Sequence, residues 1–242
     1  MDKNMIIKVC GMTDEANIQA VEQLGADLIG MVFYPKSPRY VSLIRSRAGL
    51  TPDYSRERLE RLEQTLTAAP SPTSGEPSRA GRVGVFVDEM PQTIVTRVYN
   101  HHLGYVQLHG HESAVMCGNL RRTLDPDICP GVRIIKAISV VCPEDIDAWR
   151  QYRGVVDMLL FDTHCGEVGG SGRQFDWTML SRYDGDIPFL LSGGIGPGDV
   201  ERLRAFSHPR WAGIDLNSQF ELSPGVKDID RLRTFINAIR NE

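Results

Sequence analysis

Eight short apolar segments recur along the whole chain, and stretches with helical periodicity separate most of them. The segments, rich in Val, Ile, Leu and Phe, are Met5 to Cys10, Asp27 to Phe33, Arg82 to Val87, Tyr105 to His109, Arg133 to Ile138, Val156 to Asp162, Pro188 to Leu191 and Gly213 to Leu216. Apolar strands that alternate with helices are typical of a parallel sheet with crossover helices. Eight such units within 242 residues predict an α/β fold with a single domain, a (β/α)8 TIM barrel over residues 1–242.

The stretches between the strands carry signals for helix starts, helix ends and buried faces. Asp14 to Leu24 places Ile18 and Val21 on one face, with Thr13 as the predicted N-cap and Gly25 as a left-handed stop. The last predicted helix carries Val226, Ile229, Leu232, Ile236 and Ile239 at spacings of three and four. Further helices are expected after Pro91, Ser113, Pro143, Asp176 and Pro197.

The segment from Ser42 to Gly81 is longer than a minimal barrel needs after its second strand. Its charged stretch from Arg56 to Leu66 alternates in sign, as a solvated helix face does. The following stretch, Ala69 to Gly81, is rich in Pro, Ser and Gly and cannot bury much apolar surface. We therefore expect residues 42–81 to form an extended helical and linker insertion with no catalytic role.

The charge and the cysteines restrict the class of ligand and the compartment. A formal net charge of −4 gives no basic field for nucleic acid or anionic lipid, so a small soluble ligand is favoured. The five cysteines are odd in number and lack Cys-x-x-Cys spacing, which favours neither a disulfide framework nor a zinc site. The chain starts without a signal peptide pattern, and no window reaches the ~18 apolar residues of a membrane span. These features predict a cytoplasmic protein.

Polar residues gather where the predicted strands end. They are Cys10, Tyr34 to Arg39, Asp88, His109, Asp162, Ser192 to Gly194 and Asp215 to Ser218. The carboxyl ends of all strands in such a barrel meet on one face, where the active sites of this fold lie. We therefore expect these side chains to form a site.

Two of these strand ends are suited to binding an anion. Gly193 and Gly194 follow the seventh strand, and the stretch with Asp215 and Asn217 ends the eighth, where barrels of this kind commonly hold phosphate. A glycine pair alone is at least as well explained by a tight turn. Arg39 lies in a loop stiffened by two prolines and could hold a carboxylate or a phosphate, whereas an isolated arginine there is a surface residue by default.

Cys10 and Asp162 are the candidate base and acid because each ends a strand. A thiolate is a competent base if positive charge or hydrogen-bond donors favour it, although a lone cysteine is usually a small buried hydrophobe. Asp162 follows an apolar strand where a carboxyl group can stay protonated, although it could equally cap a helix or pair with a lysine. His109 and the adjacent His101 and His102 are weaker candidates, and we expect no metal site.

Eight motifs together resemble the phosphoribosylanthranilate isomerase family of tryptophan biosynthesis. They are KVCGM from Lys8, FYPKSPRYV from Phe33, VGVFVDE from Val83, VQLHG from Val106, LLFDT from Leu159, GGSGRQFDW from Gly169, LLSGGI from Leu190 and GIDLNSQFE from Gly213. The resemblance covers nearly the whole chain apart from the insertion. It implies an Amadori rearrangement of N-(5-phosphoribosyl)anthranilate to 1-(2-carboxyphenylamino)-1-deoxyribulose 5-phosphate by general acid–base catalysis, without metal or organic cofactor.

The resemblance also assigns roles at matching positions. Asp162 would protonate the ring oxygen of the ribose, and Cys10 would take the proton from C2. Arg39 would meet the anthranilate carboxylate, while Gly193, Gly194, Asp215 and Asn217 would line the phosphate end. Asn217 stands where some relatives have serine, and its amide can still donate to phosphate. We expect a monomer or a homodimer.

Two alternatives to this function remain at this stage. A sister isomerase of histidine biosynthesis performs the same rearrangement, typically with two aspartates as the acid–base pair, and Cys10 speaks against it. A catalytically silent protein that binds a phosphorylated ligand on the same fold is the second, because fold alone does not fix function. Retention of Cys10 and Asp162 disfavours it, and only an assay excludes it.

Overall fold

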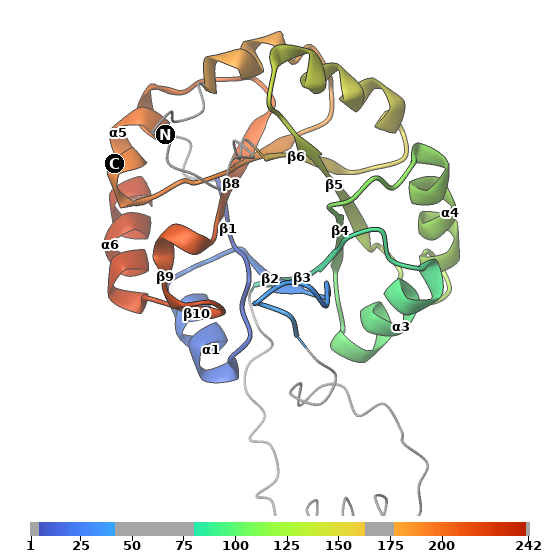
Figure 1. Ribbon diagram of the computed structural model, residues 1–242, viewed down its shortest axis with the longest axis horizontal. Helices are drawn as coiled ribbons and strands as arrows, with labels where there is room; N and C mark the ends of the chain where they lie inside the picture. Colours follow the sequence, from blue (N-terminus) through green and yellow to red (C-terminus); the bar gives the residue numbers. More distant parts are fainter. Residues whose placement is uncertain (1–4, 42–79, 163–176, 241–242) are drawn as a thin grey trace, which may run out of the picture.

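The chain forms a closed barrel of eight parallel strands in the computed structural model, which describes residues 5–41, 80–162 and 177–240. The strands are β1 (Ile6–Val9), β2 (Leu28–Val32), β3 (Gly81–Phe86), β4 (Tyr105–Leu108), β5 (Arg133–Ser139), β6 (Met158–Asp162), β7 (Phe189–Ser192) and β8 (Trp211–Leu216). Each strand pairs with its neighbours in the sequence, and β8 closes the ring on β1 (Figure 1). The predicted fold class is confirmed, and every strand end lies within two residues of its predicted position.

Helices surround the ring of strands (Figure 1). The α-helices are α1 (Glu15–Gln23), α3 (Pro91–His101), α4 (Ala114–Leu124), α5 (Val200–Ala205) and α6 (Ile229–Arg240). The 3₁₀ helices are η1 (Pro143–Tyr152), η2 (Trp177–Arg182), η3 (Pro197–Asp199) and η4 (Ser218–Phe220). A hairpin of β9 (Glu221–Ser223) and β10 (Val226–Lys227) follows η4. The stretches after Pro143 and Asp176 are thus 3₁₀ helices.

The start of α1 differs from the prediction. Asp14, not Thr13, is its N-cap, and the Asp14 carboxylate accepts a hydrogen bond from the amide of Asn17 at 2.8 Å. The Thr13 hydroxyl instead donates to the carbonyl of Gly225 at 3.1 Å, which ties the start of the helix to the β9–β10 hairpin. Gly25 has a φ of +85°, which confirms the left-handed stop.

The last helix is shorter than predicted. Val226 belongs to β10, and α6 begins only at Ile229. The carboxylate of Asp228, the residue before the helix, accepts a hydrogen bond from the amide of Arg231 at 3.0 Å. The buried face of α6 also includes Phe235. A capping aspartate therefore outweighs the apolar periodicity that extended the predicted helix backwards.

The core has two layers, because successive side chains of a strand point to opposite faces. Ile134 and Ile138 of β5 pack outward against the helices, while Ile135 and Ala137 point inward. The inner cluster consists of Leu28, Val83, Ile135, Ala137, Met158, Leu160 and Leu190. These side chains fill the interior of the barrel, as in other barrels of this size.

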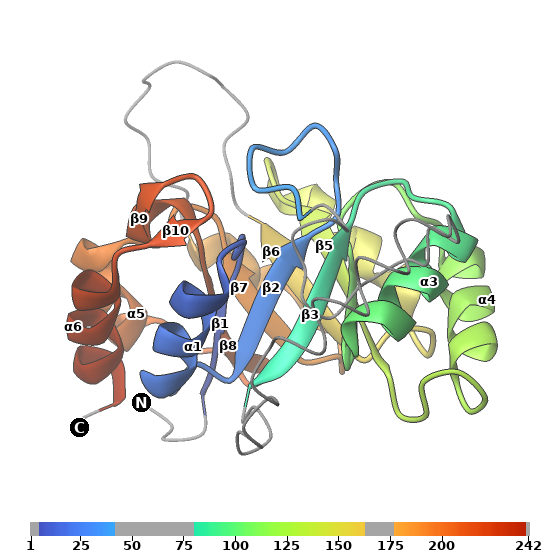
Figure 2. The same cartoon turned by 90° about the horizontal axis from the view of Figure 1, so that it is seen from below.

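The carboxyl ends of the strands define one face of the molecule. Figure 2 shows the loop after β2 and the β9–β10 hairpin on this same side, above the strand ends.

The predicted insertion, residues 42–81, lies mostly outside the described residues. Gly81 does not belong to it, because Gly81 is the first residue of β3 and pairs with Leu28. Among the residues that the structure describes, no helix is both long and apolar enough to cross a membrane.

Candidate active site

A cavity of about 350 Å³ opens at the carboxyl ends of the strands. Its lining comprises Cys10, Val32, Tyr34, Ser37, Arg39, Val85, Val87, Gln107, His109, Asp162, Ser192, Gly193, Gly194, Ile195, Asp215, Asn217, Ser218 and Gln219. All of the candidate catalytic and binding residues from the sequence, together with His109, are among them. Asp88 and His101 do not line the cavity. Asp88 instead pairs with the exposed His111 at 3.2 Å, and His101 is buried on α3.

Cys10 is held at the end of β1 by the backbone and by a glycine on the next strand. Its amide donates to the carbonyl of Leu216 on β8 at 2.8 Å, and its side chain is buried. A Cβ atom at Gly30 on β2 would lie 2.7 Å from the Cys10 sulfur, so only glycine leaves room for the thiol. Burial raises the pKa of the Cys10 thiol, and the ammonium groups of Lys8 and Lys227 oppose this effect by favouring the thiolate.

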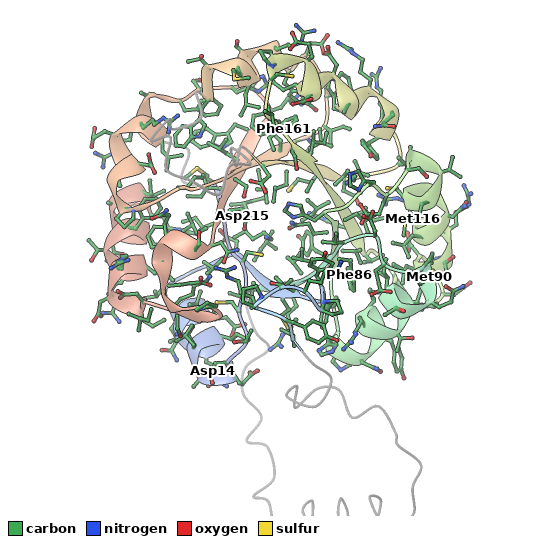
Figure 3. The ribbon with its side chains drawn as sticks, in the orientation of Figure 1. Asp14, Phe86, Met90, Met116, Phe161 and Asp215 are labelled. Atoms are coloured by element: carbon green, nitrogen blue, oxygen red, sulfur yellow. The ribbon has the colours of Figure 1, made fainter. Side chains whose placement is uncertain are left out.

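A buried ion pair lies beside Cys10. Lys8 precedes Cys10 by two residues, so both side chains point to the interior of the barrel. The Lys8 ammonium donates to the Asp215 carboxylate at 2.8 Å, and the Ser192 hydroxyl lies 3.3 Å from the other oxygen of Asp215. Although burial lowers the pKa of Lys8, the charges of Asp215 and Cys10 raise it overall, so Lys8 keeps its proton. Figure 3 shows Asp215 within the ring of strands.

Asp162 contacts His109, which in turn contacts Gln107 of β4. Its Oδ2 lies 3.2 Å from Nε2 of His109, and Nδ1 of His109 lies 2.9 Å from Nε2 of Gln107. Gln107 is 1% exposed, whereas the His109 and Asp162 side chains are 27% and 22% exposed. The three groups form a chain that runs from the interior of the barrel to the cavity.

Arg39 is held by the carboxylate of Glu221, the first residue of the β9–β10 hairpin. Its Nε and Nη2 donate to the two oxygens of Glu221 at 2.8 Å and 2.6 Å, a bidentate geometry. Lys227 donates to Glu221 and to Oδ1 of Asn217, both at 2.8 Å. Burial raises the pKa of Glu221, but the hydrogen bonds from Arg39 and Lys227 outweigh it and lower that pKa to about 2. Burial lowers the pKa of Lys227, and Glu221 partly offsets this.

Three glycines of the site adopt the left-handed backbone conformation. Gly193 and Gly194 have φ of +98° and +68°, and Gly11 has φ of +78°. At Gly11 a Cβ would lie 2.5 Å from Cδ of Arg39 and 2.7 Å from Oδ1 of Asn217. Glycine at position 11 therefore lets the loops after β1, β2 and β8 meet.

Four polar side chains that contact the candidate site residues were not found from the sequence: Lys8, Gln107, Glu221 and Lys227. Lys8 and Gln107 are polar residues inside apolar strands, and each lies two positions before a candidate residue, which is a signal that they share its face. Glu221 and Lys227 carry no such signal, because the hairpin was not predicted. Within residues 5–41, 80–162 and 177–240, no three His, Cys, Asp or Glu side chains cluster as a metal site requires.

The chain was compared with known proteins. The family model described as N-(5'phosphoribosyl)anthranilate (PRA) isomerase matches residues 65–238. A relative from Parabacteroides distasonis, named N-(5'-phosphoribosyl)anthranilate isomerase, is 42% identical over 97% of this chain and 93% of its own length. The crystal structure of phosphoribosyl anthranilate isomerase from Thermotoga maritima has a TM-score of 0.72 and 30% identity, covering 98% of this chain and 100% of that one.

A further crystal structure is that of a phosphoribosyl anthranilate isomerase in complex with reduced 1-(o-carboxyphenylamino)-1-deoxyribulose 5-phosphate. Its TM-score is 0.70 at 27% identity, and the match covers 98% of this chain and 100% of that chain. The similarity therefore extends over the strands that build the cavity.

Proposed function

We infer how the site works from the premise that the chain belongs to the N-(5'-phosphoribosyl)anthranilate isomerase family. It catalyses the isomerisation of N-(5-phosphoribosyl)anthranilate to 1-(2-carboxyphenylamino)-1-deoxyribulose 5-phosphate in tryptophan biosynthesis. We propose that Asp162 is the general acid and Cys10 the general base of this reaction. The observation that carries the proposal is that both residues line one cavity, from strands β6 and β1 on different sides of the barrel.

The reaction needs one proton donor and one proton acceptor. Asp162 gives a proton to the ring oxygen of the ribose, the bond from that oxygen to C1 breaks, and the nitrogen lone pair forms the C1=N bond of a Schiff base. Cys10 as the thiolate then takes the proton from C2, which gives an enolamine. The enolamine loses its hydroxyl proton and gains a proton at C1, leaving the ketone without net oxidation.

The environment of Cys10 is consistent with a base that works inside a desolvated cavity. Burial disfavours the thiolate, but Lys8 and Lys227 supply positive charge that stabilises it when it forms. A buried thiolate is poorly solvated by water and therefore a stronger base toward a C–H bond. Lys8 thus supports the base while it neutralises Asp215.

The two ends of the substrate are assigned to opposite parts of the cavity. Glu221 takes hydrogen bonds from two nitrogens of Arg39, and a guanidinium has five N–H donors, so we assign the remaining ones to the anthranilate carboxylate. The amides near Gly193 and Gly194 and the side chain of Asn217 are assigned to the phosphate. Asp215 lines the cavity beside them and is assigned to the same end, where Lys8 offsets its negative charge.

The ligand class, the location and the oligomeric state were also expected from the sequence. The ligand is a small phosphorylated molecule, and binding of nucleic acid has no part in the proposal. A cytoplasmic location and a monomeric or homodimeric state stay predictions.

The test is turnover of freshly generated N-(5-phosphoribosyl)anthranilate by the purified protein and its variants. Cys10→Ala and Asp162→Asn should each lower kcat by at least about 100-fold, since general acid–base groups contribute about 10²- to 10⁴-fold. Cys142→Ala and Asp184→Asn are matched controls, because both residues are exposed and neither lines the cavity. Near-normal kcat in either site variant, with its fold intact, would show that the assigned role is wrong.

A further inference from the structure

A buried ion pair of Lys136 and Glu112 lies outside the cavity, next to the turn that carries His109. The Lys136 ammonium is 3.2 Å from Oε2 of Glu112, and both side chains are 2% exposed. Lys136 lies between Ile135 and Ala137 of the inner cluster, so its side chain points away from the interior of the barrel. Two apolar side chains often stabilise a fold as well as a buried ion pair does. The contacts of the pair therefore indicate a further role.

The Lys136 ammonium binds the backbone on both sides of His109. Its Nζ donates to the carbonyl of Leu108 at 3.1 Å and to that of Gly110 at 2.8 Å. Leu108 is also the register partner of Lys136 where β4 pairs with β5. The carbonyl of Ala137 is a further acceptor at 2.9 Å. Because the first two carbonyls come immediately before and after His109, Lys136 fixes the backbone from which that ring projects.

Glu112 holds the same turn by its backbone amides. Its carboxylate accepts from the amide of Gly110 and from the amide of Asp88, both at 2.9 Å. Gly110 is thus bound at its carbonyl by Lys136 and at its amide by Glu112. A Cβ atom at Gly110 would lie 2.7 Å from the amide nitrogen of Asp88, so the loops after β3 and β4 are in contact there. The hydroxyl of Tyr152 on η1 donates to the carbonyl of Glu112 at 2.9 Å, which fixes the backbone of Glu112 as well.

The ring of His109 connects this rigid turn to Asp162. The His109 amide donates to the carbonyl of Phe86 on β3 at 2.8 Å. Nε2 of the ring lies 3.2 Å from Oδ2 of Asp162, and Nδ1 lies 2.9 Å from Nε2 of Gln107. A ring that has a partner at each nitrogen and projects from a fixed backbone cannot turn away from the carboxyl group. The contact at Oδ2 therefore fixes the orientation of the Asp162 carboxyl group.

We propose that Lys136 and Glu112 are positioning residues for the acid step, and that they act through His109 on the orientation of the Asp162 carboxyl group. Proton transfer to the ribose ring oxygen needs the donor within hydrogen-bond reach of that oxygen. A misplacement of about 1 Å can lower a rate by about 100-fold, so a loosened ring should lower kcat. Lys136 and Glu112 transfer no proton themselves. The inference rests on the proposed role of Asp162 as the general acid.

The primary test removes both charges of the pair at once. Lys136→Met combined with Glu112→Gln, the pair variant, avoids the large cost of a lone buried charge. We expect its kcat to fall by about tenfold. KM should stay near the wild-type value, because the groups assigned to the two ends of the substrate belong to other loops. A pair variant with a lower free energy of unfolding in urea but wild-type kcat would overturn the proposal.

A double-mutant cycle shows whether the pair acts through His109. His109→Leu removes the contact with Asp162 and should itself lower kcat by about tenfold. Removal of the pair in this background should cause no further fall in kcat, because the ring that the pair positions is absent. Falls of about tenfold in both backgrounds would show that the pair acts by another route, against the proposal.

Arg121 and Asp157 provide a matched control. Nη2 of Arg121 is 2.7 Å from Oδ2 of Asp157, which also accepts from the amide of Ile134 at 2.7 Å. This ion pair also binds strand backbone, but at the amino ends of β5 and β6, and neither side chain lines the cavity. Arg121→Met combined with Asp157→Asn should therefore lower stability and leave kcat unchanged. If the control lowers kcat as much as the pair variant does, general loosening of the barrel explains both results and the proposal is wrong.

Nitrogen-15 NMR of protein labelled in histidine reports on the His109 ring without an activity assay. At about pH 8 the neutral ring, with a fixed partner at each nitrogen, should show one tautomer. Its signals, assigned by their loss in His109→Leu, should move toward the average of the two tautomers in the pair variant. Signals that keep their wild-type positions would contradict the inference.

Two further results keep the test decisive. If the pair variant does not fold, Glu112→Gln alone replaces it in every measurement with the same expected directions, because glutamine keeps the shape and loses the charge. If Asp162→Asn keeps near-normal kcat, the proposed function of Asp162 has failed. If Asp162→Asn is inactive while the pair variant keeps the wild-type kcat and ring signals, only the inference about Lys136 and Glu112 has failed.

Discussion

Replacing Glu221 with glutamine should destabilise the protein by an amount that depends on pH. The Glu221 carboxylate accepts hydrogen bonds from Arg39, Lys227 and the amide of Gly225, and its side chain is 6% exposed. Glutamine has the same shape, but its amide nitrogen cannot accept from these donors. The variant therefore removes the charge and leaves the buried Lys227 and the partly buried Arg39 without their anion.

The size of the effect follows from the pKa of Glu221, which the folded protein lowers from an ordinary value of 4.5 to about 2. At ~1.4 kcal/mol per pH unit, this difference corresponds to about 3 kcal/mol of folding free energy. Because the pKa in the folded state lies below that of the unfolded state, this stability is fully present above about pH 4.5. It is lost as the pH falls toward 2, and at pH 3 about 1 kcal/mol remains.

Urea denaturation of wild type and Glu221→Gln at several pH values between 7 and 3 measures the difference. We expect the gap in the free energy of unfolding to shrink by about 2 kcal/mol over this range. Glu201→Gln is the control, because Glu201 is 81% exposed and its pair with Arg204 should contribute close to nothing at any pH. A gap for Glu221→Gln that stays constant from pH 7 to pH 3 would refute the account of this ion cluster.

Three further substitutions probe the site. Lys8→Met leaves Asp215 buried without its cation, so the free energy of unfolding measured with urea should fall by about 3–5 kcal/mol. The same variant should raise the pH at which iodoacetamide alkylates Cys10, because Lys8 favours the thiolate. An unchanged alkylation profile would contradict the role of Lys8. Gly30→Ala brings a methyl group to 2.7 Å from the Cys10 sulfur and should lower kcat by about 100-fold while circular dichroism stays unchanged. Gly11→Ala forces a side chain into φ of +78° against Arg39, so KM should rise by about tenfold; wild-type KM would argue against a fixed Arg39.

The strands and the position of the site were predictable because their signals are local. Each strand is a short apolar run, and the fold places the ends of all such runs on one face. Cys10, Asp162 and Arg39 could therefore be assigned to one site without knowledge of any contact between them. The cavity confirms that they lie together.

The partners of these residues were not predictable because they depend on register and on distant segments. Lys8 meets Asp215 only because the two are register partners on β1 and β8, and they are 207 positions apart in the sequence. The choice between Thr13 and Asp14 as the N-cap depends on the carbonyl of Gly225, which the hairpin brings to Thr13. Local capping preference cannot separate two adjacent residues that are both good caps.

The central claim, that Asp162 opens the ring and Cys10 acts after it, is tested most directly by trapping the Schiff base. Wild type, Cys10→Ala and Asp162→Asn, each in molar excess over the substrate, are mixed with fresh N-(5-phosphoribosyl)anthranilate. Sodium cyanoborohydride reduces any C1=N bond to a stable amine, which mass spectrometry quantifies. The account predicts that Cys10→Ala accumulates the reduced adduct well above the level without enzyme, and that Asp162→Asn does not. Equal amounts in the two variants would contradict the division of roles between the two residues.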